Sequence, residues 1–347
     1  MSEAMTPLER VAAILQHKEA DRVPVYPLIN GINRHFIGAD YPTWTKDPET
    51  TFRGYIAATE QLGLDCIVTL TDLSVEAGDF GQEIIYPANE AAHPSFKNHK
   101  IKDIADYARL EPIHPGERMQ SHIRLCDMLT KARGKDTPIV AFVFGPLGIV
   151  SMLRGQSDLY MDLLDDPDAV RVAVDAVTES LIEYCDRLIE TGVHAIMLDT
   201  LFSSQSIMSQ DMWDEAEGPA VERLAAHIHE KGAMVMIHNC GKGIYFDAQI
   251  KRLKPEAISF LHLPPDCKSG EELKAKYGGQ TTLIGHVDPI WVVSASDDAI
   301  REECERQMNL YAKDGGFILA TGCEYPANAD LRAAKVMIEV AKAHRYR

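Results

Sequence analysis

The sequence predicts an α/β protein built as a single (β/α)8 barrel, in which eight parallel strands form a cylinder surrounded by helices. Short β-branched runs alternate with long amphipathic segments along the whole chain, which is typical of parallel strands joined by helices. Eight such runs in 347 residues fit one closed barrel better than an open doubly wound sheet. No G-x-G-x-x-G or G-x-x-x-x-G-K-[ST] motif follows any of them, which excludes the commonest phosphate-binding loops.

The strand candidates are short apolar runs bounded by polar or turn-forming residues. They are Val23–Pro27, Cys66–Leu70, Pro138–Val143, Ala195–Leu198, Met234–Ile237, Ala257–Phe260, Thr282–Gly285 and Phe317–Thr321. If these runs pair in parallel, their carboxyl ends gather at one end of the barrel, where the active sites of this fold lie.

Helical patterns fill the intervals between the strand candidates. The segment 166–192 opens with acidic residues and a proline and ends at a glycine, and the segment 210–232 also ends at a glycine. Residues 72–115 depart from this alternation. The run "FGQEIIYP" inside them predicts a β-hairpin and an extended loop after the second strand, near the mouth of the barrel. We expect one domain over residues 1–347.

The charge balance excludes two classes of partner. There are 52 acidic against 35 basic residues, which gives a formal net charge of −17. Nucleic acids and anionic membrane surfaces would both repel such a protein. No run is long and apolar enough to span a membrane, and the start "MSEAMTPLERV" lacks the cationic and then apolar pattern of a signal peptide. These features predict a soluble, cytoplasmic protein without nucleic-acid or membrane partners.

Soft metal ligands follow two of the strand candidates. His238 and Cys240 end the fifth run in "MVMIHNCGKG", and Cys323 follows the eighth in "FILATGCEYP". Cys323 is far from the other two residues in sequence, but a barrel places all three at the same central space. One imidazole and two thiolates suit Zn²⁺, and three protein ligands leave the fourth position open, as in catalytic zinc sites. The sequence therefore predicts a zinc centre made by these three residues.

Two further residues at the strand ends have two interpretations each. Asp199, in "MLDTLFS", either orients a zinc-bound histidine or holds substrate. His262, in "ISFLHLPP", is either a fourth ligand when substrate is absent or an ordinary loop histidine.

Three stretches carry a resemblance to a known family. They are "HNCG" at 238–241, "TGCEYPANADLRAAKVMIEVAK" at 321–342 and "TPLERVAAILQHKEADRVPVYP" at 6–27. Together they span nearly the whole chain, which resembles the zinc-containing, corrinoid-linked methyltransferase branch of the uroporphyrinogen decarboxylase superfamily. The resemblance implies a (β/α)8 barrel and assigns the zinc-ligand pattern to His238, Cys240 and Cys323.

The decarboxylase branch of that superfamily is an alternative. Its members resemble this chain in having an Asp after the second strand, the position of Asp72, but they hold a polyanionic porphyrinogen with an arginine-rich motif. Here the matching stretch "YPLINGINRHF" has Arg34 as its only arginine. Asp72 is therefore predicted to be either a pocket residue or a loop cap.

The resemblance implies methyl transfer to or from the cobalt of a corrinoid. Because the chain contains no D-x-H-x-x-G corrinoid-binding motif, the corrinoid is expected on a separate partner protein. Zinc would either activate an acceptor thiol or polarise the heteroatom of a methyl donor. An apolar, aromatic composition near the mouth favours a small methylated substrate, best an aryl methyl ether, in an O-demethylase reaction. A methylcorrinoid:thiol methyltransferase, a decarboxylase and a barrel with purely structural zinc stay open, and the resemblance also suggests a homodimer.

Overall fold

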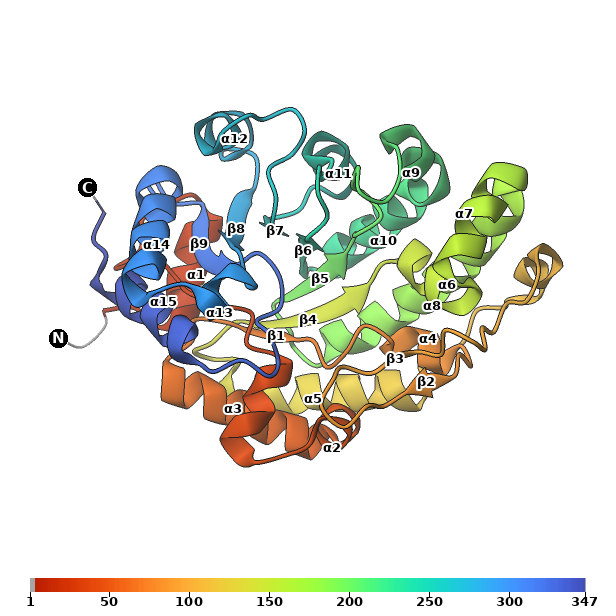
Figure 1. Ribbon diagram of the computed structural model, residues 1–347, viewed down its shortest axis with the longest axis horizontal. Helices are drawn as coiled ribbons and strands as arrows, with labels where there is room; N and C mark the ends of the chain where they lie inside the picture. Colours follow the sequence, from red (N-terminus) through yellow and green to blue (C-terminus); the bar gives the residue numbers. More distant parts are fainter. Residues whose placement is uncertain (1–3, 347) are drawn as a thin grey trace.

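The computed structural model describes residues 4–346, and its strands form one curled parallel sheet flanked by helices (Figure 1). The sheet order is β1-β4-β5-β6-β7-β8-β9, and all neighbouring pairs are parallel. Its strands are β1 (Ile67–Thr69), β4 (Ile139–Phe144), β5 (Ala195–Asp199), β6 (Met234–Asn239), β7 (Ala257–Phe260), β8 (Thr282–Val287) and β9 (Phe317–Thr321). Seven of the eight predicted strands are confirmed, with ends that differ from the prediction by at most two residues.

The predicted first strand, Val23–Pro27, is wrong as a member of the sheet. Val25 makes only an isolated parallel bridge to Leu319 of β9. On its other side, the Val25 carbonyl accepts a hydrogen bond of 3.2 Å from the amide of Asp65, which precedes β1. Pro24 and Pro27 have no amide hydrogen to donate, so a regular ladder cannot form here. The segment nevertheless touches both edges of the sheet.

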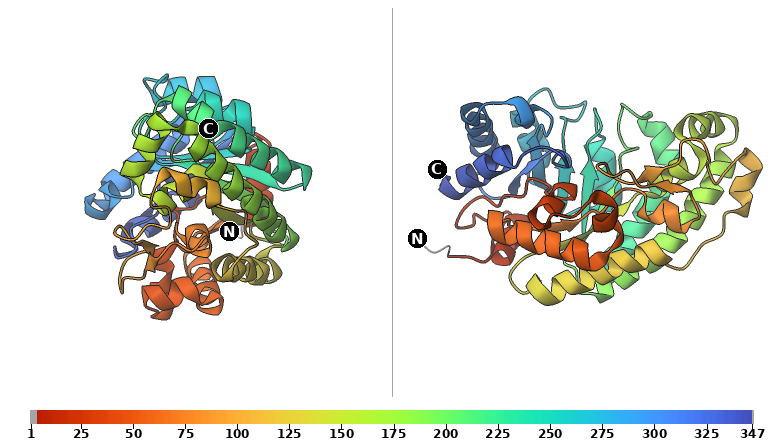
Figure 2. Two further views of the ribbon diagram at one scale, coloured as in Figure 1. Left: turned by 90° about the vertical axis from the view of Figure 1, so that its right-hand side faces the viewer. Right: turned by 60° about the horizontal axis from the view of Figure 1, so that its bottom comes forward.

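Helices cover the sheet in every view (Figure 2). The helices in chain order are α1 (Pro7–Leu15), η1 (Gly31–Ile37), α2 (Tyr41–Lys46), α3 (Pro48–Leu62), α4 (Val75–Asp79), η2 (Ile104–Arg109), α5 (Glu117–Arg133), α6 (Pro146–Arg154), α7 (Gln156–Asp165), α8 (Pro167–Glu190), α9 (Gln210–Ala216), α10 (Gly218–Glu230), α11 (Phe246–Leu253), α12 (Gly270–Tyr277), α13 (Trp291–Ser294), α14 (Asp297–Tyr311) and α15 (Arg332–Ala343). Among the described residues, none of these helices has the length and apolar character that a membrane crossing requires.

Two predicted helical segments behave differently. The segment 166–192 forms α8, capped by the Asp166 side chain, which accepts from the Ala169 amide. The segment 210–232 instead divides into α9 and α10 at Glu217, where the backbone leaves the helical region. Pro219 explains the division, because proline lacks an amide hydrogen and is tolerated only in the first turn of a helix.

The segment 72–115 carries a small antiparallel pair of strands, β2 (Ile84–Ile85) and β3 (His93–Pro94). It also contains α4 and η2, which the sequence pattern did not predict. That this segment covers the mouth of the barrel stays a prediction, as does the single domain over 1–347, of which residues 1–3 and 347 lie outside the described part.

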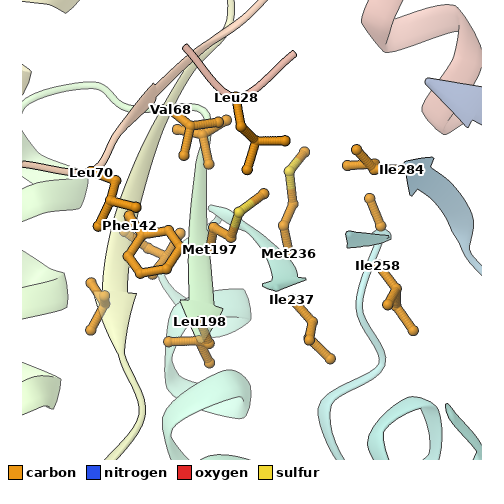
Figure 3. Close-up of a cluster of buried hydrophobic side chains, with 14 of the residues drawn as sticks. Leu28, Val68, Leu70, Phe142, Met197, Leu198, Met236, Ile237, Ile258 and Ile284 are labelled. Atoms are coloured by element: carbon orange, nitrogen blue, oxygen red, sulfur yellow. The ribbon is translucent and has the colours of Figure 1, made fainter. Parts of the chain in front are cut away.

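The inside of the curled sheet is filled by apolar side chains. Figure 3 shows Phe142, Met197 and Met236 side by side on β4, β5 and β6, whereas Leu198 and Ile237 point away from them. This alternation follows from the two-residue period of a strand. Asp199 and His238, two positions further along β5 and β6, therefore face the same interior, one layer closer to the carboxyl ends of the strands.

Candidate metal centre

Three neighbouring strands place a row of polar side chains at the top of the apolar interior. Asp199 of β5 is paired in register with His238 of β6, which is paired with Ser259 of β7. In-register residues of parallel strands point to the same face, and all three side chains are buried. Near the carboxyl ends of the strands, the layer that follows the methionines therefore consists of groups that can bind a metal or a polar substrate.

The structure brings the three predicted ligands together. One nitrogen of His238 and the sulfur atoms of Cys240 and Cys323 all lie within 4.8 Å of one another. Among residues 4–346, no other histidine, cysteine, aspartate or glutamate belongs to this group. The predicted convergence of distant residues is therefore present in the fold.

The loop after β6 is shaped to present Cys240. The Asn239 side chain donates to the carbonyl oxygens of Thr200 and Ser203, at 2.7 and 3.2 Å, and accepts from the Gly241 amide at 2.9 Å. A Cβ atom at Gly241 would lie 2.3 Å from the Ser204 hydroxyl oxygen, so the turn leaves no room for a side chain.

Cys323 is fixed by a similar arrangement after β9. The Thr321 hydroxyl donates to the Cys323 carbonyl at 2.7 Å, and the Gly322 amide donates to the Val287 carbonyl at 2.9 Å. A Cβ atom at Gly322 would lie 2.6 Å from the Cα atom of Leu261. Only glycine permits this close approach, and it sets the direction in which Cys323 leaves the strand.

The electrostatics of the three ligands favour a thiolate. The hydrogen bond from Cys240, together with the neighbouring His238, lowers the pKa of Cys323 against the effect of burial. The same pairing with Cys323 raises the pKa of Cys240. Burial opposes protonation of His238, but Cys323 and the neighbouring carboxyl groups of Asp199 and Glu324 together outweigh burial and raise the pKa of the imidazole. A divalent cation would replace the shared proton among these groups, because metal ligation requires the deprotonated thiols and the neutral imidazole.

The donor set fits zinc. Zn²⁺ takes thiolate sulfur at about 2.3 Å and imidazole nitrogen at about 2.0–2.1 Å in a tetrahedral arrangement, which places its ligands within the spacing seen here. The three soft ligands make this set unlike the all-oxygen sites of magnesium or calcium. The three residues therefore fit a zinc ion and would fill three of its four tetrahedral positions.

The structure separates His262 from the centre. His262 is not part of the ligand group and instead lines a surface pocket of about 300 Å³ together with His286, Asp288, Trp291 and Glu303. In the described part of the chain, the centre thus has three protein donors, and His262 is not one of them.

Asp199 lies beside the centre but does not orient the histidine. Its Oδ1 atom accepts from the Leu201 amide at 3.0 Å, while the Nδ1 atom of His238 lies 3.0 Å from the Ser259 hydroxyl. Burial raises the pKa of Asp199 to about 6, and the adjacent Cys323 adds to the effect. Asp199 therefore makes no described hydrogen bond to the ring of His238, and the role of holding substrate stays a prediction.

Asp72 has the contacts of a loop cap, one of its two predicted interpretations, whereas its role in the pocket stays a prediction. Its Oδ1 atom accepts from the amide and hydroxyl of Ser74, at 2.9 and 2.6 Å, as a loop cap does. Its Oδ2 atom accepts from Thr45 and forms an ion pair with Arg118 of α5. The sequence pattern did not identify Arg118 as a basic neighbour of Asp72, because Arg118 is distant in sequence and reaches the carboxylate only through the fold.

Two other site residues were not identified as functional from the sequence. Glu324, next to Cys323, accepts from the Gly31 amide at 2.8 Å, and burial raises its pKa to about 7. Ser259 contacts His238, yet a serine within an apolar strand carries no recognisable signal by itself. The position of Glu324 beside a predicted ligand was the only clue that the sequence offered.

The buried carboxyl group of Glu76 predicts a pH dependence of the free energy of unfolding. Glu76 of α4 accepts from the Phe144 amide at 3.1 Å, and burial raises its pKa from 4.5 to about 8. Because the folded-state pKa is the higher one, the carboxyl favours folding at low pH, and this contribution is lost as the pH rises from about 4.5 to about 8.

We expect the free energy of unfolding of Glu76→Gln to fall much less between low and high pH than that of the wild type. The difference should be a few kcal/mol, at about 1.4 kcal/mol per pKa unit. Urea unfolding at pH 5 and at pH 8 measures it, with the exposed Glu339→Gln as the control. Equal pH dependence in the wild type and in Glu76→Gln would contradict the assignment.

Comparison with known proteins adds relatives of two kinds. The chain is 23% identical over 334 residues to the methylcobamide:CoM methyltransferase MtaA of Methanosarcina barkeri, covering 95% of each chain. It is 23% identical over 267 residues to a uroporphyrinogen decarboxylase of Pseudomonas fluorescens, covering 75% of this chain and 73% of that one. Both branches weighed from the sequence are thus represented.

Solved structures agree on the fold. A methyltransferase from Methanosarcina mazei superimposes with a TM-score of 0.79 at 20% identity, over 97% of this chain and 98% of that chain. A B12-independent methionine synthase from Shewanella reaches a TM-score of 0.55 at 13% identity. The family model described as uroporphyrinogen decarboxylase (URO-D) matches residues 6–344. The chain therefore belongs to the uroporphyrinogen decarboxylase family, as its resemblance predicted.

Proposed function

We propose that this protein is a zinc-dependent methyltransferase that moves a methyl group between a small methylated substrate and the cobalt of a separate corrinoid protein. The observation that carries this proposal is the group formed by His238, Cys240 and Cys323 at the open ends of the strands. A zinc ion held there would supply Lewis-acid activation of the heteroatom that bears or receives the methyl group. The names of the methyltransferase relatives support the same chemistry.

The residues around the ligands suit substrate binding. At neutral pH the carboxylate of Asp199, with a pKa of about 6, is largely ionised and offers an acceptor at the level of His238. Asp72 is proposed to shape the pocket wall through its ion pair with Arg118, because all its described contacts already hold the loop. We therefore propose that a polar group of the substrate binds Asp199.

For the substrate we favour an aryl methyl ether, which would make the enzyme an O-demethylase. Arg34 and Arg118 already bind other groups of the protein. Arg34 donates to the carbonyls of Gly31 and Ala327 and to Asn328, and Arg118 pairs with Asp72. An uncharged substrate needs neither of them, whereas a polyanionic porphyrinogen would need several free cations.

In such a reaction, the bond between the methyl carbon and the ether oxygen breaks. Its electron pair stays on the oxygen, which takes a proton from solvent to give a phenol. The methyl group passes to the reduced cobalt of the partner, which supplies the electron pair of the new bond and is formally oxidised by two electrons.

A thiol acceptor is the second candidate. Lys242, two residues after Cys240, is exposed on the loop that follows β6 and could bind the acidic tail of a thiol. Three relatives are named methylcobamide:CoM methyltransferases, which supports this candidate. In this direction the methyl group would leave the corrinoid for the sulfur.

The architecture that we propose is one domain closed into an eight-membered barrel, with the segment around Val25 in the place of the eighth strand. Its bridge to β9 and its hydrogen bond from Asp65 support this closure. The corrinoid partner would approach the carboxyl ends of the strands, and a homodimer is part of the proposal.

The test uses the full-length protein, zinc and free reduced cobalamin in place of the unidentified partner. Methoxylated aromatics are offered as donors while cobalt absorbance is followed, and thiols are offered with methylcobalamin in parallel. We expect demethylation of an aryl ether, lost after chelation and restored by zinc. His238→Ala, which removes one ligand, is the matched control.

Methyl transfer to thiols alone would establish the second candidate and reject the first. Failure of the wild type to bind zinc under metal-replete conditions would reject both, and equal activity of His238→Ala would remove the centre from the reaction.

A further inference from the structure

The imidazole of His238 has an unusual hydrogen-bond partner, the hydroxyl of Ser259. Its Nδ1 atom lies 3.0 Å from the Oγ atom of Ser259, and both residues are buried. The contact is built into the sheet, because His238 and Ser259 are paired in register on β6 and β7. The ring of Phe142 lies against the imidazole with its centroid 6.1 Å away.

A metal-bound histidine normally donates its second nitrogen to a carboxylate, a backbone carbonyl or water. The nearest carboxylate in the row, Asp199, is bound to the Leu201 amide and makes no described hydrogen bond to the ring. In the described structure, the hydroxyl of Ser259 takes the place that a carboxylate would have.

We propose that Ser259 is a positioning residue for His238, an inference that rests on the proposed metal centre. Its hydroxyl would fix the orientation of the imidazole ring and the tautomer that presents Nε2 to the metal. When the ring proton is on Nδ1, this nitrogen donates to Oγ and the lone pair of Nε2 is free for the ion. The register of β6 and β7 then determines the angle at which the imidazole meets the two sulfur atoms.

A hydroxyl adds a property that a carboxylate lacks. It can accept a hydrogen bond from Nδ1–H, or donate one to an unprotonated Nδ1. Ser259 can therefore act as the partner of Nδ1 whether or not this nitrogen carries a proton.

The chain offers matched variants for a test. Ser259→Ala removes the hydroxyl, and Ser259→Thr keeps it with a side chain that strands favour. An interior cavity of about 20 Å³, lined by Ser259, Met197 and Met236 among others, adjoins the position. Ser203→Ala is the control, because the Ser203 hydroxyl is also buried but has no hydrogen-bond partner within the described residues.

Zinc affinity is measured by competition with a chromogenic chelator, and folding by circular dichroism. We expect Ser259→Ala to weaken zinc binding by about 10–100-fold. Ser259→Thr should stay within a few-fold of the wild type, and Ser203→Ala should bind as the wild type does. Unchanged affinity in a folded Ser259→Ala would overturn the proposal.

Histidine tautomers give a second readout that does not require a substitution of Ser259. In ¹⁵N-histidine-labelled, zinc-loaded wild type, we expect His238, assigned by its loss in His238→Ala, to carry its proton on Nδ1. A proton on Nε2 with the metal on Nδ1 would refute the role of Ser259. If the wild type binds no zinc, the proposed function falls together with this inference, whereas normal zinc binding with an indifferent Ser259→Ala rejects the inference alone.

Discussion

Cys323→Ser is expected to abolish stoichiometric zinc binding and, with it, methyl transfer. The variant removes one of three donors that lie within 4.8 Å of one another and leaves a hydroxyl, a much poorer ligand for zinc. Loss of a direct ligand should exceed the roughly 10–100-fold effect of changing an outer partner, so we expect affinity to fall by more than about 100-fold. Metal analysis after gel filtration measures the content directly.

Cys304→Ser is the matched control for this change. Cys304 is a buried cysteine of α14 and does not belong to the ligand group. It should retain about one zinc per chain even if its stability declines slightly. Zinc retained at full stoichiometry in Cys323→Ser would show that Cys323 is not a ligand, whatever the effect on activity.

Asp65→Ala is expected to destabilise the fold by about 3–5 kcal/mol. Asp65 is almost fully buried and forms ion pairs with Arg10 of α1, at 2.6 Å, and with Arg22, also at 2.6 Å. It further accepts from the Val25 amide at 2.8 Å. Without this carboxylate, two buried guanidinium groups lose their shared counterion, and the segment around Val25 loses a tie to the start of β1.

Urea unfolding at neutral pH measures this effect. The exposed ion pair between Arg301 and Glu339 provides the control, since Glu339→Ala should cost no more than about 1 kcal/mol. Equal losses in the two variants would mean that the buried cluster contributes no more than a surface pair.

The sequence was sufficient to predict the buried strands. β4, residues 234–237 of β6 and residues 317–320 of β9 are continuous apolar runs, because both faces of a parallel strand are covered in this architecture. The metal ligands were predictable for a related reason. Polar residues directly after such runs must lie at the carboxyl end of the sheet, so His238 and Cys323 could be assigned to one place without knowing any distance.

The remaining features depend on contacts that a linear pattern does not contain. The run Val23–Pro27 has the composition of a strand, but its prolines restrict it to a single bridge. Arg118 reaches Asp72 from a helix 46 positions away, and Ser259 meets His238 only through the register of β6 and β7. Partners of this kind are determined by side-chain direction in the folded state rather than by local sequence.

The distribution of the three ligands over β6 and the end of β9 has a consequence for the biogenesis of the protein. Two strands, β7 and β8, lie between them in the sheet, so the donors do not meet until the sheet has curled. A nascent chain therefore has no preformed trap for the ion, unlike a short C-x-x-C hairpin that can capture zinc as it leaves the ribosome. Maturation should proceed from a finished apoprotein that takes up its metal last, and cellular zinc supply would then govern occupancy without governing the yield of folded chains.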